Sequence, residues 1–339
     1  MFLKGFVFLP FLAVSTLATG ASPRTVDVGS LRRAFERPVV IPSAPGNPSS
    51  SEKIVLGRTL FFDPRLSASG IVSCATCHNP SLSWGDGLRR AVGHGMKELG
   101  RRTPSILNVA FGGPYMWDGR FETLEEQALG PISTPAEMNL PLDELVKRLR
   151  AVDGYTPLFD AAFPGEAITP HNVARAIATF ERTVISPPAP FDRWVGGEPN
   201  AISSAAVRGF SLFNGKAKCA VCHSGWRLTD DSFHDLGVRD DDLGRGGVKD
   251  FTEITALKHA FKTPTLRDIE RRAPYFHGGT SSSLESVVEF YNRGGDARRE
   301  SLSDEIRPLG LTEPERADLV AFLKTLSSPT DVVVPVLPR

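Results

Sequence analysis

The pentapeptide pattern CxxCH occurs twice in this chain, at residues 74–78 and 219–223, and it constrains the fold more than any other feature. Two cysteines three positions apart lie on one face of a helical turn, and the histidine that follows is held beside them. This spacing is typical of a c-type haem, whose vinyl groups bind both sulfurs and whose iron binds the histidine. The candidate attachment residues are Cys74, Cys77, His78, Cys219, Cys222 and His223, which include all four cysteines of the 339 residues.

Three other uses of these cysteines compete with haem attachment. Disulfide bonds would suit an exported chain, but they would leave the two histidines without a role. A zinc site built from all four cysteines would bring together pairs about 140 residues apart, against usual spacings of roughly 15–20. A thioredoxin-type CxxC needs no histidine. The sequence therefore favours two covalently bound haems c.

The first 21 residues are typical of a secretory signal peptide. Lys4 is followed by an apolar stretch over residues 5–17 and by small residues up to Ala21. The apolar stretch is too short to span a bilayer. We therefore expect a periplasmic protein that begins near Ser22 and has no membrane insertion.

The composition describes an ordinary soluble protein with balanced charge. The chain has 39 basic and 39 acidic residues, 41% hydrophobic residues and 23% charged residues. A protein that binds nucleic acid usually carries a basic surplus, so this class is disfavoured. The length is sufficient for two domains, each with its own core.

Downstream of each CxxCH pattern the sequence repeats itself at a constant shift. Thr103 and Thr263 are one identical pair, and Tyr115 and Tyr275 are another. The same shift relates further pairs of proline, glycine, leucine and glutamate. The repeat predicts two copies of one haem-binding unit that arose by internal duplication.

The same shift pairs Pro131 with Tyr291 and Trp117 with His277. Tyr291 closes a predicted helix, where it either packs in the core or binds the second iron through its phenolate oxygen. Proline has no side-chain donor, so the corresponding position over the first iron would be open. No methionine follows the second CxxCH pattern, which disfavours a His/Met haem in the C-terminal half.

Together these motifs resemble the bacterial di-haem cytochrome c peroxidase/MauG family. The resemblance covers roughly residues 50–327. It implies a mainly α fold with two cytochrome c-like haem domains. The segments that carry it are 100–108 (GRRTPSILN), 117–120 (WDGR), 124–131 (LEEQALGP), 135–138 (PAEM), 274–277 (PYFH) and the tail helix around 311–324.

The resemblance also implies roles for individual residues. Glu137 matches the distal carboxylate of the peroxide-binding haem, with Gln127 beside it, and Trp117 matches the aromatic residue between the haems. Tyr291 matches the second axial ligand of MauG-type members, where ordinary peroxidases have methionine. His94 matches a loop histidine that caps the first iron until reduction. By itself, Glu137 would be interpreted as a solvated loop residue and His94 as a solvent-facing one.

The leading functional hypothesis is an exported di-haem peroxidase that consumes hydrogen peroxide at the first haem and passes electrons through the second. Its electron donor would be a small c-type cytochrome or another redox protein. A MauG-like enzyme that oxidises Trp or Tyr side chains of a partner protein is an alternative, as is a non-enzymatic di-haem electron carrier. Calcium is a further candidate, bound by carbonyls near Arg272 and Pro274, although Arg102 stands where many family members have Asn.

The expected organisation has four parts after the signal peptide. These are an N-terminal peroxidatic haem domain over 22–185, a Pro/Gly-rich linker over 186–200, a C-terminal electron-relay haem domain over 201–327 and an irregular tail over 328–339. The histidines His171, His234 and His259 are expected outside the ligand set. Helices are predicted at Leu140–Arg150, His171–Arg182, Ala201–Phe213, Leu284–Tyr291 and Glu313–Leu326.

Overall fold

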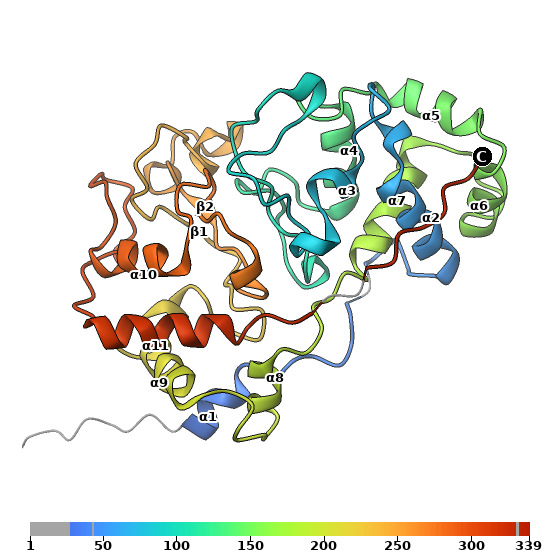
Figure 1. The fold of residues 1–339 in the computed structure, drawn as a ribbon. Coiled ribbons are helices and arrows are strands. Elements are labelled where there is room, and N and C mark those ends of the chain that lie inside the picture. The colour runs from blue at the N-terminus through green and yellow to red at the C-terminus, as the bar shows by residue number, and fades with distance from the viewer. Residues whose placement is uncertain (1–27, 43, 330–331) are drawn as a thin grey trace, which may run out of the picture.

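Helices form most of the regular structure in the computed structural model, which describes residues 28–42, 44–329 and 332–339 (Figure 1). The predicted signal peptide lies outside the described residues. Within them, the strands β1 (Phe233–His234) and β2 (Phe261–Lys262) form one two-stranded antiparallel sheet. The prediction of a mainly α fold is confirmed. The α-helices are α1 (Val28–Arg33), α2 (Ser51–Phe62), α3 (Cys74–Cys77), α4 (Leu124–Ser133), α5 (Leu142–Arg150), α6 (Tyr155–Ala162), α7 (Pro170–Glu181), α8 (Pro190–Val195), α9 (Ser204–Asn214), α10 (Leu284–Asn292) and α11 (Glu313–Lys324).

All five helices predicted from the sequence are present as α5, α7, α9, α10 and α11, with ends shifted by at most three residues. Capping explains several starts. The Thr123 hydroxyl accepts a hydrogen bond from the Glu126 amide at the start of α4, and Ser283 plays the same part at α10. Such caps satisfy amide groups that the first turn leaves unpaired.

The described residues form two hydrophobic cores. The first lies among α2 and α4 to α7, and the second among α8 to α11. In each core two long helices cross where a glycine faces a backbone carbonyl. A Cβ atom on Gly57 of α2 would lie 1.9 Å from the Ala176 oxygen of α7, and one on Gly209 of α9 would lie 2.0 Å from the Asp318 oxygen of α11. Neither crossing leaves room for a side chain.

The loop downstream of each CxxCH motif is anchored, by the same pair of hydrogen bonds, to the segment that follows the last helix of its half. The Asn108 amide donates to the Val184 carbonyl at 2.8 Å, and the Asp268 amide donates to the Leu326 carbonyl at 3.0 Å. The side-chain oxygen of each accepts from a serine amide two residues further on, at 3.0 Å and 2.9 Å. The two halves therefore share local structure as well as sequence.

The two ends of the described chain each cross to the other half (Figure 1). Phe35, just after α1, packs in the second core. At the other end, the Pro338 carbonyl accepts a hydrogen bond from Arg65 at 3.0 Å, and the Arg339 carbonyl accepts one from Gly154 at 3.1 Å. Each end of the chain thus packs against the other half, which the predicted division into consecutive domains does not include. The domain boundaries stay a prediction.

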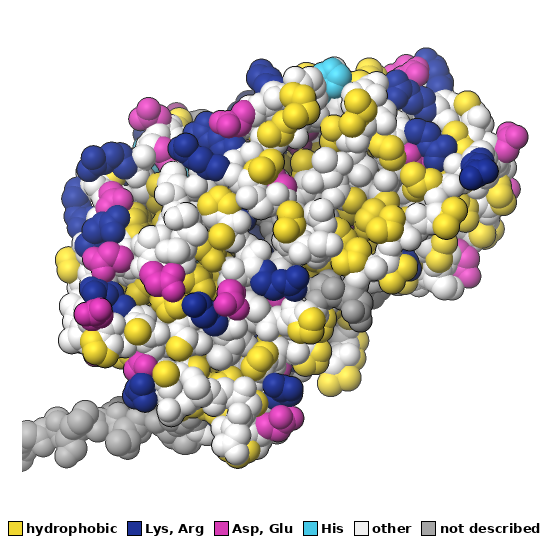
Figure 2. Space-filling view, in the orientation of Figure 1, with side chains coloured by type: hydrophobic (Ala, Val, Ile, Leu, Met, Phe, Trp, Pro, Cys, Tyr) yellow, Lys and Arg dark blue, Asp and Glu magenta, His cyan; other side chains and the backbone are white. Residues whose placement is uncertain are grey.

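On the face in Figure 2, acidic and basic side chains are interspersed. This distribution agrees with the balanced charge of the chain. Within the described ranges, no helix combines the length and apolar character that crossing a membrane requires.

Candidate active site

The first CxxCH motif forms a short helix that presents its histidine to a cavity. The His78 amide donates to the Cys74 carbonyl at 2.8 Å, which closes the turn α3. The Nδ1 atom of His78 lies 3.2 Å from the Trp84 carbonyl oxygen, so Nε2 is the nitrogen left for a metal. Burial lowers the pKa of His78 and favours the neutral imidazole that binds iron.

The second motif repeats this arrangement. The His223 amide donates to the Cys219 carbonyl at 2.9 Å, and its Nδ1 lies 2.9 Å from the Leu228 carbonyl oxygen. Burial again lowers the pKa of the imidazole. A backbone partner at Nδ1 fixes the ring orientation in both halves and leaves Nε2 as the free nitrogen.

One continuous cavity of about 720 Å³ reaches both motifs. Its lining includes all four cysteines, and each of them is a free thiol in the structure. Burial raises the pKa of Cys77 to about 11 and that of Cys219 to about 12. Among the described residues, the one candidate metal cluster contains a single cysteine. The structure therefore supports neither the disulfide nor the four-cysteine zinc alternative.

Two buried arginines test whether the cavity fits haem. Arg102 and Arg272 both line it, and the Nε atom of each is buried without a hydrogen-bond partner in the described structure. Burial, with the positive charge of Arg102, lowers the pKa of Arg272 to about 10, and Asp268 opposes the shift. Haem carries two propionates that arginine side chains can pair with. The donors present fit this cofactor.

The first pocket brings together a carboxyl group, an amide and a proline. Glu137, Gln127 and Pro131 all line the cavity, and the last two lie on α4. Burial raises the pKa of Glu137, while the positive charge of Arg120 opposes the shift. The Gln127 amide donates to the Met116 sulfur at 3.7 Å. The carboxyl group of Glu137 and the amide of Gln127 could form hydrogen bonds with a small polar substrate in the first pocket.

The second pocket places a phenol where the first has proline. Tyr291 lies on α10 and lines the cavity. Its pKa is raised, chiefly by burial and further by its proximity to Cys219 and Cys222. The structure thus brings Tyr291 to the second CxxCH motif, as the repeat predicts.

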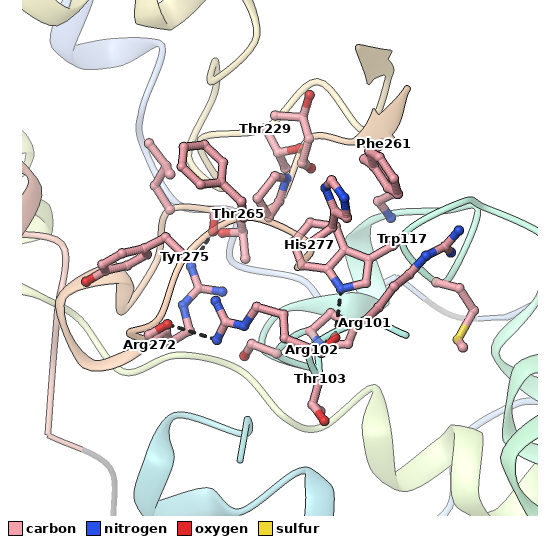
Figure 3. A pocket seen from close by; sticks show the side chains of 18 of the residues that line it. Arg101, Arg102, Thr103, Trp117, Thr229, Phe261, Thr265, Arg272, Tyr275 and His277 are labelled. Atoms are coloured by element: carbon pink, nitrogen blue, oxygen red, sulfur yellow. Dashed lines mark hydrogen bonds between the residues drawn. The ribbon is translucent and has the colours of Figure 1, made fainter. Parts of the chain in front are cut away.

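Trp117 lies where the two halves meet. Its indole Nε1 donates to the Arg102 carbonyl at 2.9 Å, and its ring centroid lies 6.5 Å from that of His277 (Figure 3). The backbone contacts around the pair are reciprocal. The Arg102 amide donates to the His277 carbonyl at 2.8 Å, and the Lys262 amide donates to the Trp117 carbonyl at 2.9 Å. Positions that the repeat aligns therefore exchange equivalent bonds across the interface.

Comparison with known proteins decides the family. Residues 51–200 match the family model described as di-haem cytochrome c peroxidase. The chain is 52% identical to the methylamine utilization protein MauG of Methylorubrum extorquens, over 95% of this chain and 93% of that protein. The chain belongs to the di-haem cytochrome c peroxidase/MauG family. It is a haem-containing oxidoreductase of the peroxidase type.

More distant family members support this assignment. The cytochrome c551 peroxidase of Nitrosomonas europaea is 36% identical, over 86% of this chain and 85% of that protein. A crystal structure described as a MauG-like protein associated with microbial copper homeostasis superposes with a TM-score of 0.79 at 34% identity, covering 86% of this chain and 95% of that one.

Two further predictions from the family resemblance concern His94 and calcium. The His94 amide donates to the Glu137 carbonyl at 2.7 Å, but Gly93, and not His94, lines the cavity. An Arg102 Nη2 donates to the Arg272 carbonyl at 2.8 Å, so a calcium ion bound to that carbonyl would meet a guanidinium. Both the capping role of His94 and calcium binding stay predictions.

Sequence reasoning missed several residues that line the cavity. His234 and His259 do so, whereas His171 is exposed. His234 lies 2.8 Å from Asp230, and this contact, with a second from Cys222, raises its pKa to about 10. A protonated imidazole does not bind a metal. His234 lies on β1, a strand of two residues, which is too short to be recognised from the sequence, so its place in the cavity could not be predicted. Glu181 also lines the cavity.

Proposed function

We propose that this protein is an exported MauG-like di-haem enzyme that reduces hydrogen peroxide at the first pocket and receives electrons through the second. The observation that carries the proposal is the asymmetry at one aligned position. Pro131 offers the first pocket no side-chain donor, whereas Tyr291 places a phenol near Cys219 and Cys222 of the second motif. An open coordination position suits substrate binding, and a filled one suits electron transfer.

The chain would hold both cofactors covalently. Each pair of cysteine sulfurs would form two thioether bonds, and His78 and His223 would bind iron through Nε2. Tyr291 would bind the second iron through its oxygen, which requires the loss of the phenolic proton. When bound, the first haem supplies an iron that can accept peroxide, and the second supplies a relay for single electrons.

Glu137 and Gln127 would handle peroxide in the first pocket. The Glu137 carboxylate takes the proton from one peroxide oxygen and returns it to the other, which makes water the leaving group. The raised pKa of Glu137 brings it closer to the working pH and so favours both transfers. The Gln127 amide can donate a hydrogen bond to the bound peroxide. The balance is one peroxide, two protons and two electrons in, and two water molecules out.

Trp117 would connect the two pockets. Its ring lies in the interface, hydrogen-bonded to the Arg102 carbonyl and next to His277. An indole in this position offers a route for electrons between the halves.

Oxidation of Trp or Tyr side chains on a partner protein is the second candidate function. It is favoured by the 52% identity to a protein named methylamine utilization protein MauG and by tyrosine at position 291.

A donor assay on the wild-type holoprotein tests the proposal and separates the two candidates. With peroxide, we expect two equivalents of a reduced small c-type cytochrome to be oxidised per peroxide. Slow oxidation of the cytochrome with new covalent changes at aromatic side chains of a partner would favour the second candidate. Peroxide that is not consumed in either assay would contradict both.

The matched local structure of the halves supports a separate proposal, that they arose by internal duplication. The glycine crossings and the asparagine or aspartate anchors recur in both halves. A family alignment in which the two halves share a common profile would support it, and two unrelated profiles would contradict it.

A further inference from the structure

The last residue of α7, Glu181, has a buried carboxyl oxygen, in the wall of the cavity, without a hydrogen-bond partner in the described structure. Glu181 is 4% exposed and lines the cavity beside the first CxxCH motif. Its Oε2 atom is buried and has no hydrogen-bond partner among the described residues. Its charge acts on Cys74, which places the carboxyl near the first attachment cysteine. An isolated buried carboxylate is costly, so its presence calls for an explanation.

The second half has leucine at the corresponding position. Phe180 of α7 packs on Gly57, and Phe322 of α11 packs on Gly209 in the same way. The residue after each phenylalanine is Glu181 in the first half and Leu323 in the second, and both line the cavity. The shared scaffold is therefore compatible with an apolar side chain here, and the acid is specific to the first pocket.

The cation next to Glu181, the guanidinium of Arg182, forms its hydrogen bonds with another carboxylate. Arg182 lowers the pKa of Glu181, but its two terminal nitrogens bind Glu125 of α4 at 2.8 Å and 2.9 Å. Glu125 itself raises the pKa. The remaining titratable groups that face it are Cys74 of α3 and Tyr115, whose hydroxyl donates to a backbone carbonyl. Burial is the largest cause and raises the pKa of Glu181 to about 8.

We propose that Glu181 is a redox-linked proton acceptor of the first pocket, separate from the peroxide chemistry of Glu137, which takes up one proton when an electron enters the first haem and releases it when the electron leaves. The electron comes from the redox partner and the proton comes from water, so the net charge of the pocket does not change. The inference rests on the proposed haem at the first CxxCH motif.

The direction of the effect follows from electrostatics. The oxidised haem carries one more positive charge and favours the Glu181 carboxylate, whereas the reduced haem favours the acid. Between the two pKa values, the reduction potential of the first haem therefore falls as pH rises. A tenfold fall in proton concentration corresponds to at most about 59 mV for one electron. Leu323 offers no such group to the second haem.

The test is a spectroelectrochemical titration of both haems in the holoprotein from about pH 6 to about pH 9, the region around the raised pKa. The proteins compared are wild type, Glu181→Gln, Glu181→Leu and the control Glu126→Gln, which changes an exposed cap residue that glutamine can replace. We expect a falling first-haem potential in wild type and the control, and loss of that slope in both Glu181 variants. The second haem should behave alike in all four.

A wild-type first haem with a pH-independent potential would overturn the inference, and so would a slope that survives in Glu181→Gln. If neither variant loads haem, the infrared difference spectrum of wild type decides, because reduction must then produce a carboxylic acid C=O band and its absence excludes proton uptake by Glu181. Haem content and peroxide turnover, measured in parallel, distinguish this failure from failure of the proposed function. Two haems and normal turnover with no slope refute only the role of Glu181.

Discussion

The two haem pockets share a scaffold and differ in a few side chains. Both have a glycine crossing and an imidazole whose Nδ1 faces a backbone carbonyl. The lining differs at several aligned places, and two of them matter most here: the first pocket has Pro131 and Glu181 where the second has Tyr291 and Leu323. The two halves therefore present similar backbone geometry, and the proposed difference between a peroxide-binding haem and an electron-relay haem rests on single side chains.

The interface between the halves likewise combines a shared backbone arrangement with different side chains. Trp117 and His277 occupy aligned positions, and their carbonyls accept equivalent hydrogen bonds from Lys262 and Arg102. The side chains nevertheless differ, and His277 stacks on Phe261 with ring centroids 3.5 Å apart. The backbone of the two halves is therefore alike at this interface, whereas the side chains, Trp117 and His277, are different.

The largest expected effect comes from removing the carboxyl group of Glu137, which we propose transfers protons to and from peroxide in the first pocket. Glu137→Gln keeps the size of the side chain and removes its ability to exchange a proton. We expect peroxide turnover to fall by about 10²- to 10⁴-fold, the usual contribution of general acid–base catalysis. Stopped-flow absorption of the holoprotein with peroxide measures it.

The matched control is again Glu126→Gln, whose exposed carboxylate caps α4. It should turn over peroxide at the wild-type rate, and both variants should contain two haems. Undiminished turnover in Glu137→Gln would show that this carboxyl takes no part in the reaction and that the first pocket works by other means.

A smaller effect is expected where the halves are alike. Gly57→Ala and Gly209→Ala each place a methyl group about 2 Å from a carbonyl oxygen. Because the helices must separate, we expect each change to lower the free energy of unfolding by about 1–3 kcal/mol. Denaturant unfolding of the holoprotein measures both.

Gly100→Ala serves as the reference, because a Cβ atom there meets no heavy atom within 4 Å. Similar losses at both crossings, with none in the reference, would support a shared scaffold. A large loss at one crossing and none at the other would break the equivalence of the two halves.

The sequence predicts the features that depend on local pattern. The CxxCH spacing predicts both attachment motifs, and the constant shift pairs Pro131 with Tyr291, both of which line the cavity in the structure. The five predicted helices are present because their apolar periodicity and caps are local.

The features that the sequence could not supply depend on distant contacts. Glu181 and Leu323 are not 160 residues apart, because the connections before α7 and α11 differ in length, so the shift that pairs Pro131 with Tyr291 does not align them. The unpaired Nε atoms of Arg102 and Arg272 become visible only when the chain folds. The packing of Phe35 in the second core likewise has no sequence signal.

The most direct test of the asymmetry is electron paramagnetic resonance of the ferric holoprotein, wild type against Tyr291→Phe. The account predicts one high-spin and one low-spin haem in wild type, with peroxide removing the high-spin signal, and a second high-spin signal in the variant. Tyr275→Phe is the control, since that hydroxyl donates to the Ile269 carbonyl at 3.1 Å and should not alter either iron. An unchanged spectrum in Tyr291→Phe would contradict the account.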